Sequence, residues 1–304
     1  MEKGARKSRG ADPQMNSEEA DSSRNRDYSG IIELLKGYTG HPGAALTRSG
    51  DAAIYVACFL AKLLRKKRML IPDQGGWLTY KTYPLVFDLE VEEIHTTDAL
   101  IDLNDLKKKA DDTCAFIVPS MGGYFVEEPL ESIGELSRKR GCLVIVDATA
   151  AVSDAVLCNG NDADIILGSF GKGKIIDAGY GGFISFREKE YRDRARELLA
   201  LMKFDRDGFL PVVHEKLIHA QKRLSSFFSR STQVKEDCRN RNLDVIHRGS
   251  RSVNVVIGFA SEKEKNEILK YCHAKNLEYT LCPRYIRVMR SAVSIELKRG
   301  SIAL

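Results

Sequence analysis

Short runs of uninterrupted apolar residues alternate with helical patterns along the first two thirds of the chain. Runs of this kind are typical of strands that are covered on both faces of a parallel sheet. Five of them are predicted strands: residues 69–72, 115–118, 142–146, 165–167 and 182–186. Helices are predicted over residues 31–35, 52–64 and 131–139. The alternation predicts an α/β fold with a doubly wound, mostly parallel sheet.

The last third of the chain has a different pattern. Two charged helical segments, residues 188–202 and 212–228, precede a further group of predicted elements. That group is a strand, a helix and two strands, at residues 252–259, 262–275, 277–288 and 292–297. We therefore expect a large domain at residues 28–200, and linking helices with a smaller α+β domain at residues 201–304. Residues 1–27 have almost no apolar side chains and are predicted to be a disordered tail.

The composition predicts a globular protein with a full core, since 43% of the 304 residues are hydrophobic. No apolar run approaches the roughly 20 residues that a membrane-spanning helix needs, and the polar N-terminus lacks the apolar core of a signal peptide. The seven cysteines are scattered without Cys-x-x-Cys spacing, and the six histidines show no metal spacing. A cytoplasmic protein with reduced thiols, no metal and no membrane partner is expected.

The net charge of +5 is unevenly distributed, because basic residues outnumber acidic ones chiefly over residues 187–304. A field of this sign would attract an anionic substrate, a nucleotide or RNA. A solvated surface rich in lysine and arginine is the favoured interpretation. Nucleic acid is therefore not the expected partner.

An acid and a lysine occupy positions that suit one cofactor. Asp147 directly follows the predicted strand 142–146, and Lys174 lies in a glycine-rich loop downstream. A lysine amine condenses with the aldehyde of pyridoxal phosphate, while a carboxylate holds the pyridine nitrogen protonated so that the ring accepts electrons. Asp147 alone would be interpreted as an ordinary strand-end residue that caps a turn. The two residues together predict a pyridoxal-phosphate enzyme.

The same loop partly matches a second motif. Gly168, Gly173 and Lys174 have the spacing of a phosphate-binding P-loop, but Ile175 stands where a serine or threonine hydroxyl must bind magnesium. The loop is also followed by a predicted strand rather than by a helix. A nucleotide hydrolase is therefore disfavoured.

The lysine segment also carries a family pattern: Ser-Phe, three residues, Lys, four residues, then Gly-x-Gly-Gly. The residues in register are Ser169, Phe170, Lys174, Gly179, Gly181 and Gly182. On these residues the chain resembles the fold-type I pyridoxal-phosphate enzymes, and within them the DegT/DnrJ/EryC1/StrS aminotransferases, best known for aminating nucleotide-linked sugars. The resemblance implies pyridoxal phosphate as cofactor, an amino-acid donor, a keto acceptor and a homodimer.

The resemblance assigns roles to the residues of the motif. Lys174 takes the position that holds the cofactor and then moves the substrate proton as general base and acid, while Asp147 is the partner of the pyridine nitrogen. Lys172, on the same loop, is the alternative: an accessory cation or a solvated charge. Burial and a neighbouring positive charge are expected to lower the pKa of Lys174.

The phosphate is expected at the start of a helix. Ser49-Gly50-Asp51 resembles the family's Gly-Thr-Ala-Ala helix start, where backbone N–H groups and the helix dipole meet the anion. Ser169 corresponds to the family's second phosphate contact. Asp51 departs from the usual threonine, and a carboxylate beside a phosphate is unfavourable unless it points away or caps the helix.

The ring of the cofactor is expected between two further segments. Trp77, the only tryptophan, follows Gly75-Gly76, where the family places an aromatic residue that stacks on the ring; a core tryptophan is the alternative. Ala148 is expected to pack under the ring, with the hydroxyl of Thr149 nearby. Ala150 departs from the glutamine or histidine that the family commonly has there.

The substrate carboxylate is assigned to an arginine of the predicted strand 277–288. Arg287 is the candidate, with Arg284 and Arg290 as alternatives, because a guanidinium binds a carboxylate through two parallel hydrogen bonds. The C-terminal part is shorter than in the sugar aminotransferases. Two alternatives therefore stay open: a lyase, desulfurase or tRNA-linked conversion, and a non-catalytic relative with the same fold.

Overall fold

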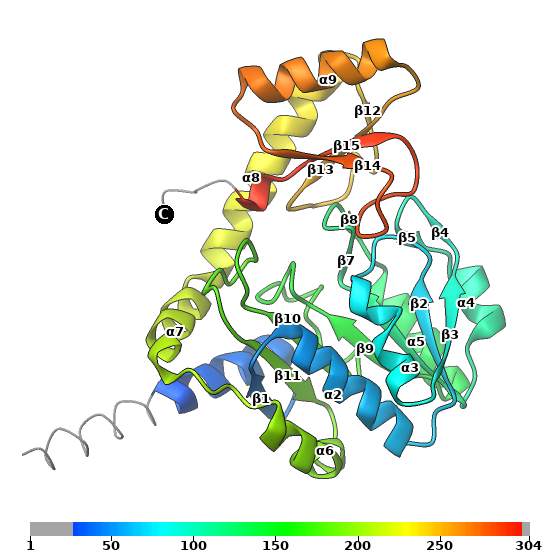
Figure 1. Ribbon diagram of the computed structural model, residues 1–304, viewed down its shortest axis with the longest axis vertical. Helices are drawn as coiled ribbons and strands as arrows, with labels where there is room; N and C mark the ends of the chain where they lie inside the picture. The colour runs from blue at the N-terminus through cyan, green and yellow to red at the C-terminus, as the bar shows by residue number, and fades with distance from the viewer. Residues whose placement is uncertain (1–26, 300–304) are drawn as a thin grey trace, which may run out of the picture.

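A seven-stranded sheet forms the centre of the molecule, and the computed structural model describes residues 27–299 of it (Figure 1). The predicted tail, apart from residue 27, lies outside this range. The spatial order of the strands is β1-β11-β10-β9-β6-β2-β3. In chain order their bounds are β1 (Gly43–Thr47), β2 (Arg68–Pro72), β3 (Glu90–Ile94), β6 (Cys114–Pro119), β9 (Leu143–Asp147), β10 (Ile165–Ser169) and β11 (Gly182–Phe186). Only β11 runs antiparallel to its two neighbours, so the predicted mostly parallel sheet is confirmed.

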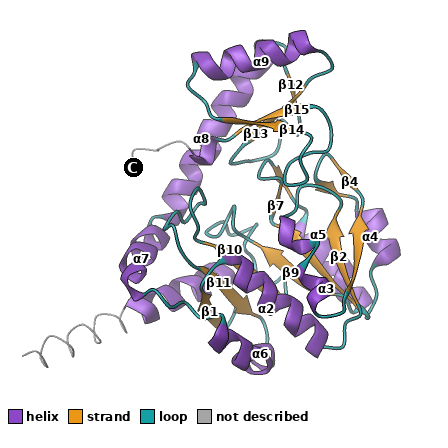
Figure 2. Cartoon of the chain, viewed as in Figure 1, coloured by secondary structure: helices purple, strands orange, loops and turns teal. Residues whose placement is uncertain are grey.

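Helices cover both faces of this sheet (Figure 2). Alternate residues of β6 enter two different apolar cores, with Phe116 and Val118 in one and Ala115 and Ile117 in the other. The helices of this part are residues 27–39, α2 (Gly50–Leu63), α3 (Tyr83–Val86), α4 (Leu103–Lys109), α5 (Leu130–Arg140) and α6 (Lys189–Leu201). Both faces are buried because strands without a polar face must be covered twice, as the doubly wound prediction required.

Two strands of the sheet, β1 and β3, were not predicted from the sequence. β3 has the sequence Glu-Val-Glu-Glu-Ile at the edge of the sheet, where its side chains are largely exposed, so it shows no apolar run. β1 is the opposite edge strand and pairs only with β11. The residues of β1 are mostly buried, but they include only one large apolar side chain, Leu46, so they form no marked apolar run. Between β2 and β3, the residues after Trp77 form a 3-10 turn, η1 (Leu78–Tyr80), followed by the single turn of α3.

A second, smaller sheet lies at the other end of the molecule, with helix α9 (Glu262–Ala274) across it (Figure 1). It contains β12 (Asp244–Val245), β13 (Val255–Gly258), β14 (Tyr279–Cys282) and β15 (Ala292–Ile295), in the order β12-β13-β15-β14. The additional C-terminal α+β domain is thus present. The boundary between residues 200 and 201 stays a prediction.

Two predicted elements of this region are wrong in their extent. The single helix at residues 212–228 is instead two helices, α7 (Leu210–Ile218) and α8 (Ala220–Arg239). The strand at residues 277–288 ends at Cys282, because Pro283 has no N–H to donate to a neighbouring strand. Residues 283–291 are therefore a loop.

Short elements complete the described chain. They are β4 (Thr96–Thr97), β5 (Leu100–Ile101), β7 (Met121–Gly122), β8 (Val126–Glu127), η2 (Asp207–Phe209) and η3 (Leu297–Arg299). Loops of the two sheets are joined by hydrogen bonds: the N–H of Gly75 donates to the carbonyl of Tyr285, and the N–H of Asn254 to the carbonyl of Tyr124. Between residues 27 and 299 no helix has the length and apolarity to cross a membrane.

Candidate active site

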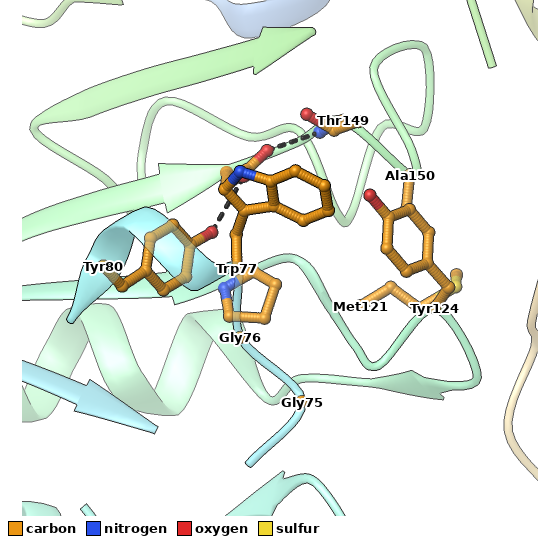
Figure 3. A pocket seen from close by; sticks show the side chains of 10 residues that line it. Gly75, Gly76, Trp77, Tyr80, Met121, Tyr124, Thr149 and Ala150 are labelled. Carbon is orange, nitrogen blue, oxygen red and sulfur yellow. Dashed lines mark hydrogen bonds between the residues drawn. The ribbon is translucent and has the colours of Figure 1, made fainter. Parts of the chain in front are cut away.

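Three adjoining pockets lie at the carboxyl ends of β6, β9 and β10, and all three are lined by Trp77 and Tyr124. The first is also lined by Tyr80, Thr149 and Ala150 (Figure 3), and by Asp147. The second adds the start of α2, and the third is a cavity of about 530 Å³ that opens toward the C-terminal segment. Ligands bind at this edge in open α/β sheets. The geometry therefore brings most of the predicted site residues to one place.

Asp147 is the last residue of β9 and is held by two donors. The hydroxyl of Tyr80 donates to Oδ2 at 2.8 Å, and the N–H of Thr149 donates to Oδ1 at 3.0 Å. Burial raises the pKa of Tyr80 well above its ordinary value, and the charge of Asp147 adds to the effect. Tyr80 therefore stays a proton donor that orients the carboxylate in the pocket.

Lys174 projects from the glycine-rich loop into the same space. Its Nζ donates to the hydroxyl of Tyr124 at 3.0 Å and lies 4.4 Å from the centre of the Trp77 ring. Burial acts to lower the pKa of Lys174, but Tyr124 and the charge of Asp147 outweigh it and raise the pKa above its ordinary value. The expected depression is thus not found. Lys172 is exposed at the mouth of the cavity.

The start of α2 meets the end of β10 at the third side of the pocket. Ser49 is the N-cap of the helix, and its Oγ accepts from the N–H of Ala52 at 3.0 Å. A Cβ on Gly50 would lie 2.6 Å from the Cβ of Ser169, so only glycine allows this close approach. The hydroxyl of Thr149 in turn accepts from the N–H of Ser169 at 2.9 Å. The helix end, Ser169 and Thr149 form one connected wall.

Asp51 lies in the first turn of α2 and holds the indole of Trp77. Its Oδ1 accepts from Trp77 Nε1 at 2.8 Å and from the hydroxyl of Thr79 at 3.0 Å. The carboxylate that departs from the family pattern is thus engaged by two donors. It orients the ring instead of standing free beside an anion.

Ala148 is placed differently from its expectation. Ala148 is fully buried in the core below the sheet edge, and the pocket is lined by Thr149 and Ala150 instead. A side chain directly after the end of a strand points to the opposite face from its neighbours, which explains the shift by one residue. Ala148 therefore does not pack under a ligand in this pocket.

Arg287 lies in the loop between β14 and β15 and not on a strand. It is 2% exposed and forms a bidentate pair with Glu296, Nη2 to Oε2 at 2.7 Å and Nε to Oε1 at 3.0 Å. Burial acts to raise the pKa of Glu296, but Arg287 outweighs it and lowers the pKa to about 2. The guanidinium that the sequence assigns to a substrate carboxylate is thus already paired with Glu296. Arg284 and Arg290 are exposed, and Arg290 pairs with Asp98.

Sequence reasoning missed three side chains of the site: Tyr80, Tyr124 and Lys298. Tyr124 has a φ of 71°, a conformation that costs free energy in a non-glycine residue and marks functional positions. The Gly122-Gly123 pair before it was the available signal. Tyr80 and Lys298 lie in short 3-10 turns and carry no pattern of their own. Among residues 27–299, no group of histidine, cysteine, aspartate and glutamate could hold a metal ion.

The fold and this pocket define the class of fold-type I pyridoxal-phosphate enzymes. A carboxylate, an indole face, a lysine amine and a helix start surround one space, as this cofactor requires. Residues 34–220 match the model of the DegT/DnrJ/EryC1/StrS aminotransferase family. The chain belongs to this family, and membership implies pyridoxal phosphate as its cofactor. Residues 216–303 match the MJ1341 family C-terminal domain.

Individual relatives extend the comparison. The chain is 36% identical over 96 residues to a probable glycine dehydrogenase (decarboxylating) subunit 1 of Solibacter usitatus (strain Ellin6076), a match that covers 30% of this chain and 21% of that protein. The chain thus spans about a fifth of that relative.

Two solved structures share the fold at low identity. The sphingosine-1-phosphate lyase of Burkholderia pseudomallei has a TM-score of 0.73 at 12% identity, over 92% of this chain and 73% of its own. 3-amino-5-hydroxybenzoic acid synthase has a TM-score of 0.69 at 13% identity, over 90% of this chain and 86% of its own. Because one fold supports several reactions, these structures do not identify the reaction of this chain, which has to be argued from its site.

Proposed function

We propose that this protein is a pyridoxal-phosphate-dependent aminotransferase that moves an amino group from an amino-acid donor to a keto acceptor. The observation that carries the proposal is the placement of Lys174 Nζ against the Trp77 ring, in the pocket that Asp147 closes. The cofactor, when bound, supplies an aldehyde for amines and a ring that accepts electrons.

Each residue has one task in the proposal. Lys174 holds the cofactor and later carries the proton to and from the substrate α-carbon. Asp147, oriented by Tyr80, would hold the pyridine nitrogen, and Trp77 would bind the ring. Backbone N–H groups at the start of α2, with Ser169, would hold the phosphate.

The buried thiols argue against a desulfurase, the first alternative. All seven cysteines are free and buried, and burial raises the pKa of Cys158 above its ordinary range. A sulfur carrier needs an accessible thiolate. A lyase or a tRNA-linked conversion stays an alternative outcome of the assays, and sulfide release from cysteine would revive the desulfurase.

A homodimer is part of the proposal. Leu78, Leu85 and Val86 are between 57% and 59% exposed on η1 and α3, next to Trp77. Exposed apolar side chains that cluster near a site are typical of an interface. A monomer that is fully active in solution would contradict the proposed homodimer. A cytoplasmic location is also proposed, and transport of the protein to another compartment would contradict it.

The decisive experiment loads the protein with pyridoxal phosphate, records its visible spectrum, reduces it with borohydride and maps the labelled peptide. Label on Lys174, together with glutamate-dependent formation of 2-oxoglutarate, would support the proposal. Label on Lys172 or Lys298 would overturn the assignment of Lys174. Protein that takes up no cofactor would favour a non-catalytic relative.

A further inference from the structure

The wall of the cavity formed by the C-terminal segment differs in charge from the rest of the site. The cavity of about 530 Å³ is lined by more cationic than acidic side chains. The cationic ones are Lys172, Lys174, Arg287, Lys298 and Arg299, and the acidic ones are Asp177 and Glu278. Such an excess in a concave, partly desolvated space attracts anions.

Lys298 is the unusual member of this wall. It lies in η3, is only 6% exposed, and has its Nζ 3.5 Å from the centre of the Tyr124 ring. Among residues 27–299 no acceptor or carboxylate is found within bonding distance of this amine, whereas Arg287 beside it is fully engaged with Glu296. The side chain of Lys298 lines the cavity, so its amine is available to an anionic group that enters there.

The surroundings of Lys298 determine its charge. Burial lowers the pKa of Lys298 well below its ordinary value; the charges of Arg287, Lys174 and Arg299 add to this effect, and only Glu296 opposes it. The groups that face it come from five places: Tyr124 after β7, Lys174 after β10, Arg287 before β15, Glu296 after β15 and Arg299 on η3. An anion placed on the amine would reverse the balance and favour the ammonium form.

We propose that Lys298 anchors an oxyanion-binding subsite for a carboxylate or phosphate group that enters the cavity. The inference rests on the proposed function and deepens it. The substrate would be an amino or keto compound that carries such an anionic group away from the reacting carbon. The Tyr124 ring supports the ammonium by a cation–π contact while its hydroxyl accepts from Lys174.

The test is calorimetric and needs no turnover. Cofactor-loaded protein is titrated with glutarate, and separately with inorganic phosphate, over a series of pH values. We expect one anion to bind, with an affinity that falls as the pH rises, because the pKa of Lys298 is lowered and a bound anion favours its ammonium form. The preferred probe distinguishes a carboxylate from a phosphate site.

Three variants sharpen the test. Lys298→Met keeps the buried chain and should lose at least about tenfold in affinity. Lys298→Arg should bind the anion with a weaker dependence on pH, because a guanidinium is always charged. Lys263→Met removes an exposed lysine of α9 that does not line the cavity, and should change the affinity by no more than about threefold.

The proposal is overturned if wild-type protein binds neither probe, or if Lys298→Met binds as tightly as wild type. These outcomes differ from a failure of the proposed function. That failure would appear beforehand, as protein that takes up no cofactor or as loaded protein that transfers no amino group.

Discussion

The site has two halves that are built differently. The half formed by the large sheet consists of strand ends and a helix start, where Asp147, Ser169 and Thr149 are linked by hydrogen bonds to one another's backbone. The half formed by the C-terminal segment consists of a loop and a 3-10 turn, where a buried pair, Arg287 and Glu296, lies beside a buried amine, Lys298. The first half is suited to a fixed cofactor, and the second to an anion that comes and goes.

The difference matters for function because the two halves can vary independently. Strand ends are held in register by the whole sheet, so groups on them keep their geometry. Loops that lie opposite a fixed site change charge and shape without disturbing it, and such segments set specificity in many folds. We therefore expect substitutions in the first half to affect chemistry, and those in the second to affect stability and substrate binding.

The largest effect is expected from the first half. Lys174→Ala removes both the attachment point and the proton carrier, and should lower turnover by about 10³- to 10⁴-fold. The measurement is glutamate-dependent formation of 2-oxoglutarate, with bound cofactor determined separately. Lys172→Ala is the control and should lose less than about tenfold. Normal turnover in Lys174→Ala would contradict the role proposed for Lys174.

In the second half the largest expected effect is on stability. Arg287→Met leaves the carboxylate of Glu296 buried without its partner and should lower the free energy of unfolding by about 3–5 kcal/mol at neutral pH. Urea denaturation followed by circular dichroism measures it. Arg290, an exposed residue that pairs with Asp98 and Asp244, supplies the control, because Arg290→Met should cost no more than about 1 kcal/mol.

The loss of stability in Arg287→Met should also depend on pH. Because the pKa of Glu296 is lowered to about 2 in the folded protein, its pairing stabilises the fold fully above the pKa of about 4.3 that it has when unfolded. The stabilisation is lost as the pH falls from there toward 2. The difference between wild type and Arg287→Met should therefore shrink over this range, and a constant difference would contradict the assignment.

Tyr124 joins the two halves and is expected to have an intermediate effect. Tyr124→Phe removes the hydroxyl that raises the pKa of Lys174, so more of the amine is neutral at a given pH. Covalent attachment of the cofactor should then become faster by up to about tenfold, with its pH dependence shifted to lower pH. Stopped-flow absorbance over a pH series measures both. Tyr38→Phe, far from the pocket, is the control; an unshifted profile in Tyr124→Phe would refute the coupling.

The smallest effect concerns Asp51. Asp51→Asn keeps an acceptor for the indole of Trp77 but removes a negative charge near the phosphate, and should tighten cofactor binding by about threefold. Asp51→Ala also loses the hydrogen bond and should bind about fivefold more weakly than Asp51→Asn. Equilibrium titration with quenching of Trp77 fluorescence measures both. Equal affinities would mean that Asp51 does not hold the ring.

The sequence predicted the central strands of the large sheet better than the elements of the C-terminal segment. β11 was predicted with its observed bounds, and β2, β6, β9 and β10 within two residues at each end, because a strand buried on both faces needs an unbroken apolar run. Edge strand β3 was missed because its charged residues face solvent. The strand assigned to Arg287 was wrong, because the break at Pro283 is a local feature that an apolar pattern does not reveal. The roles assigned to the site residues stay predictions.

By itself the sequence determined the family, the cofactor and the lysine loop, since strand patterns and the Ser-Phe-Lys-Gly spacing are properties of neighbouring residues. Only the tertiary structure decided that Asp51 holds Trp77, that Arg287 is committed to Glu296, and that Tyr124 lies between Lys174 and Lys298. These contacts join residues 9 to 174 positions apart. Which of several charged side chains meet is decided by packing, because charge alone carries no directional pattern along the chain.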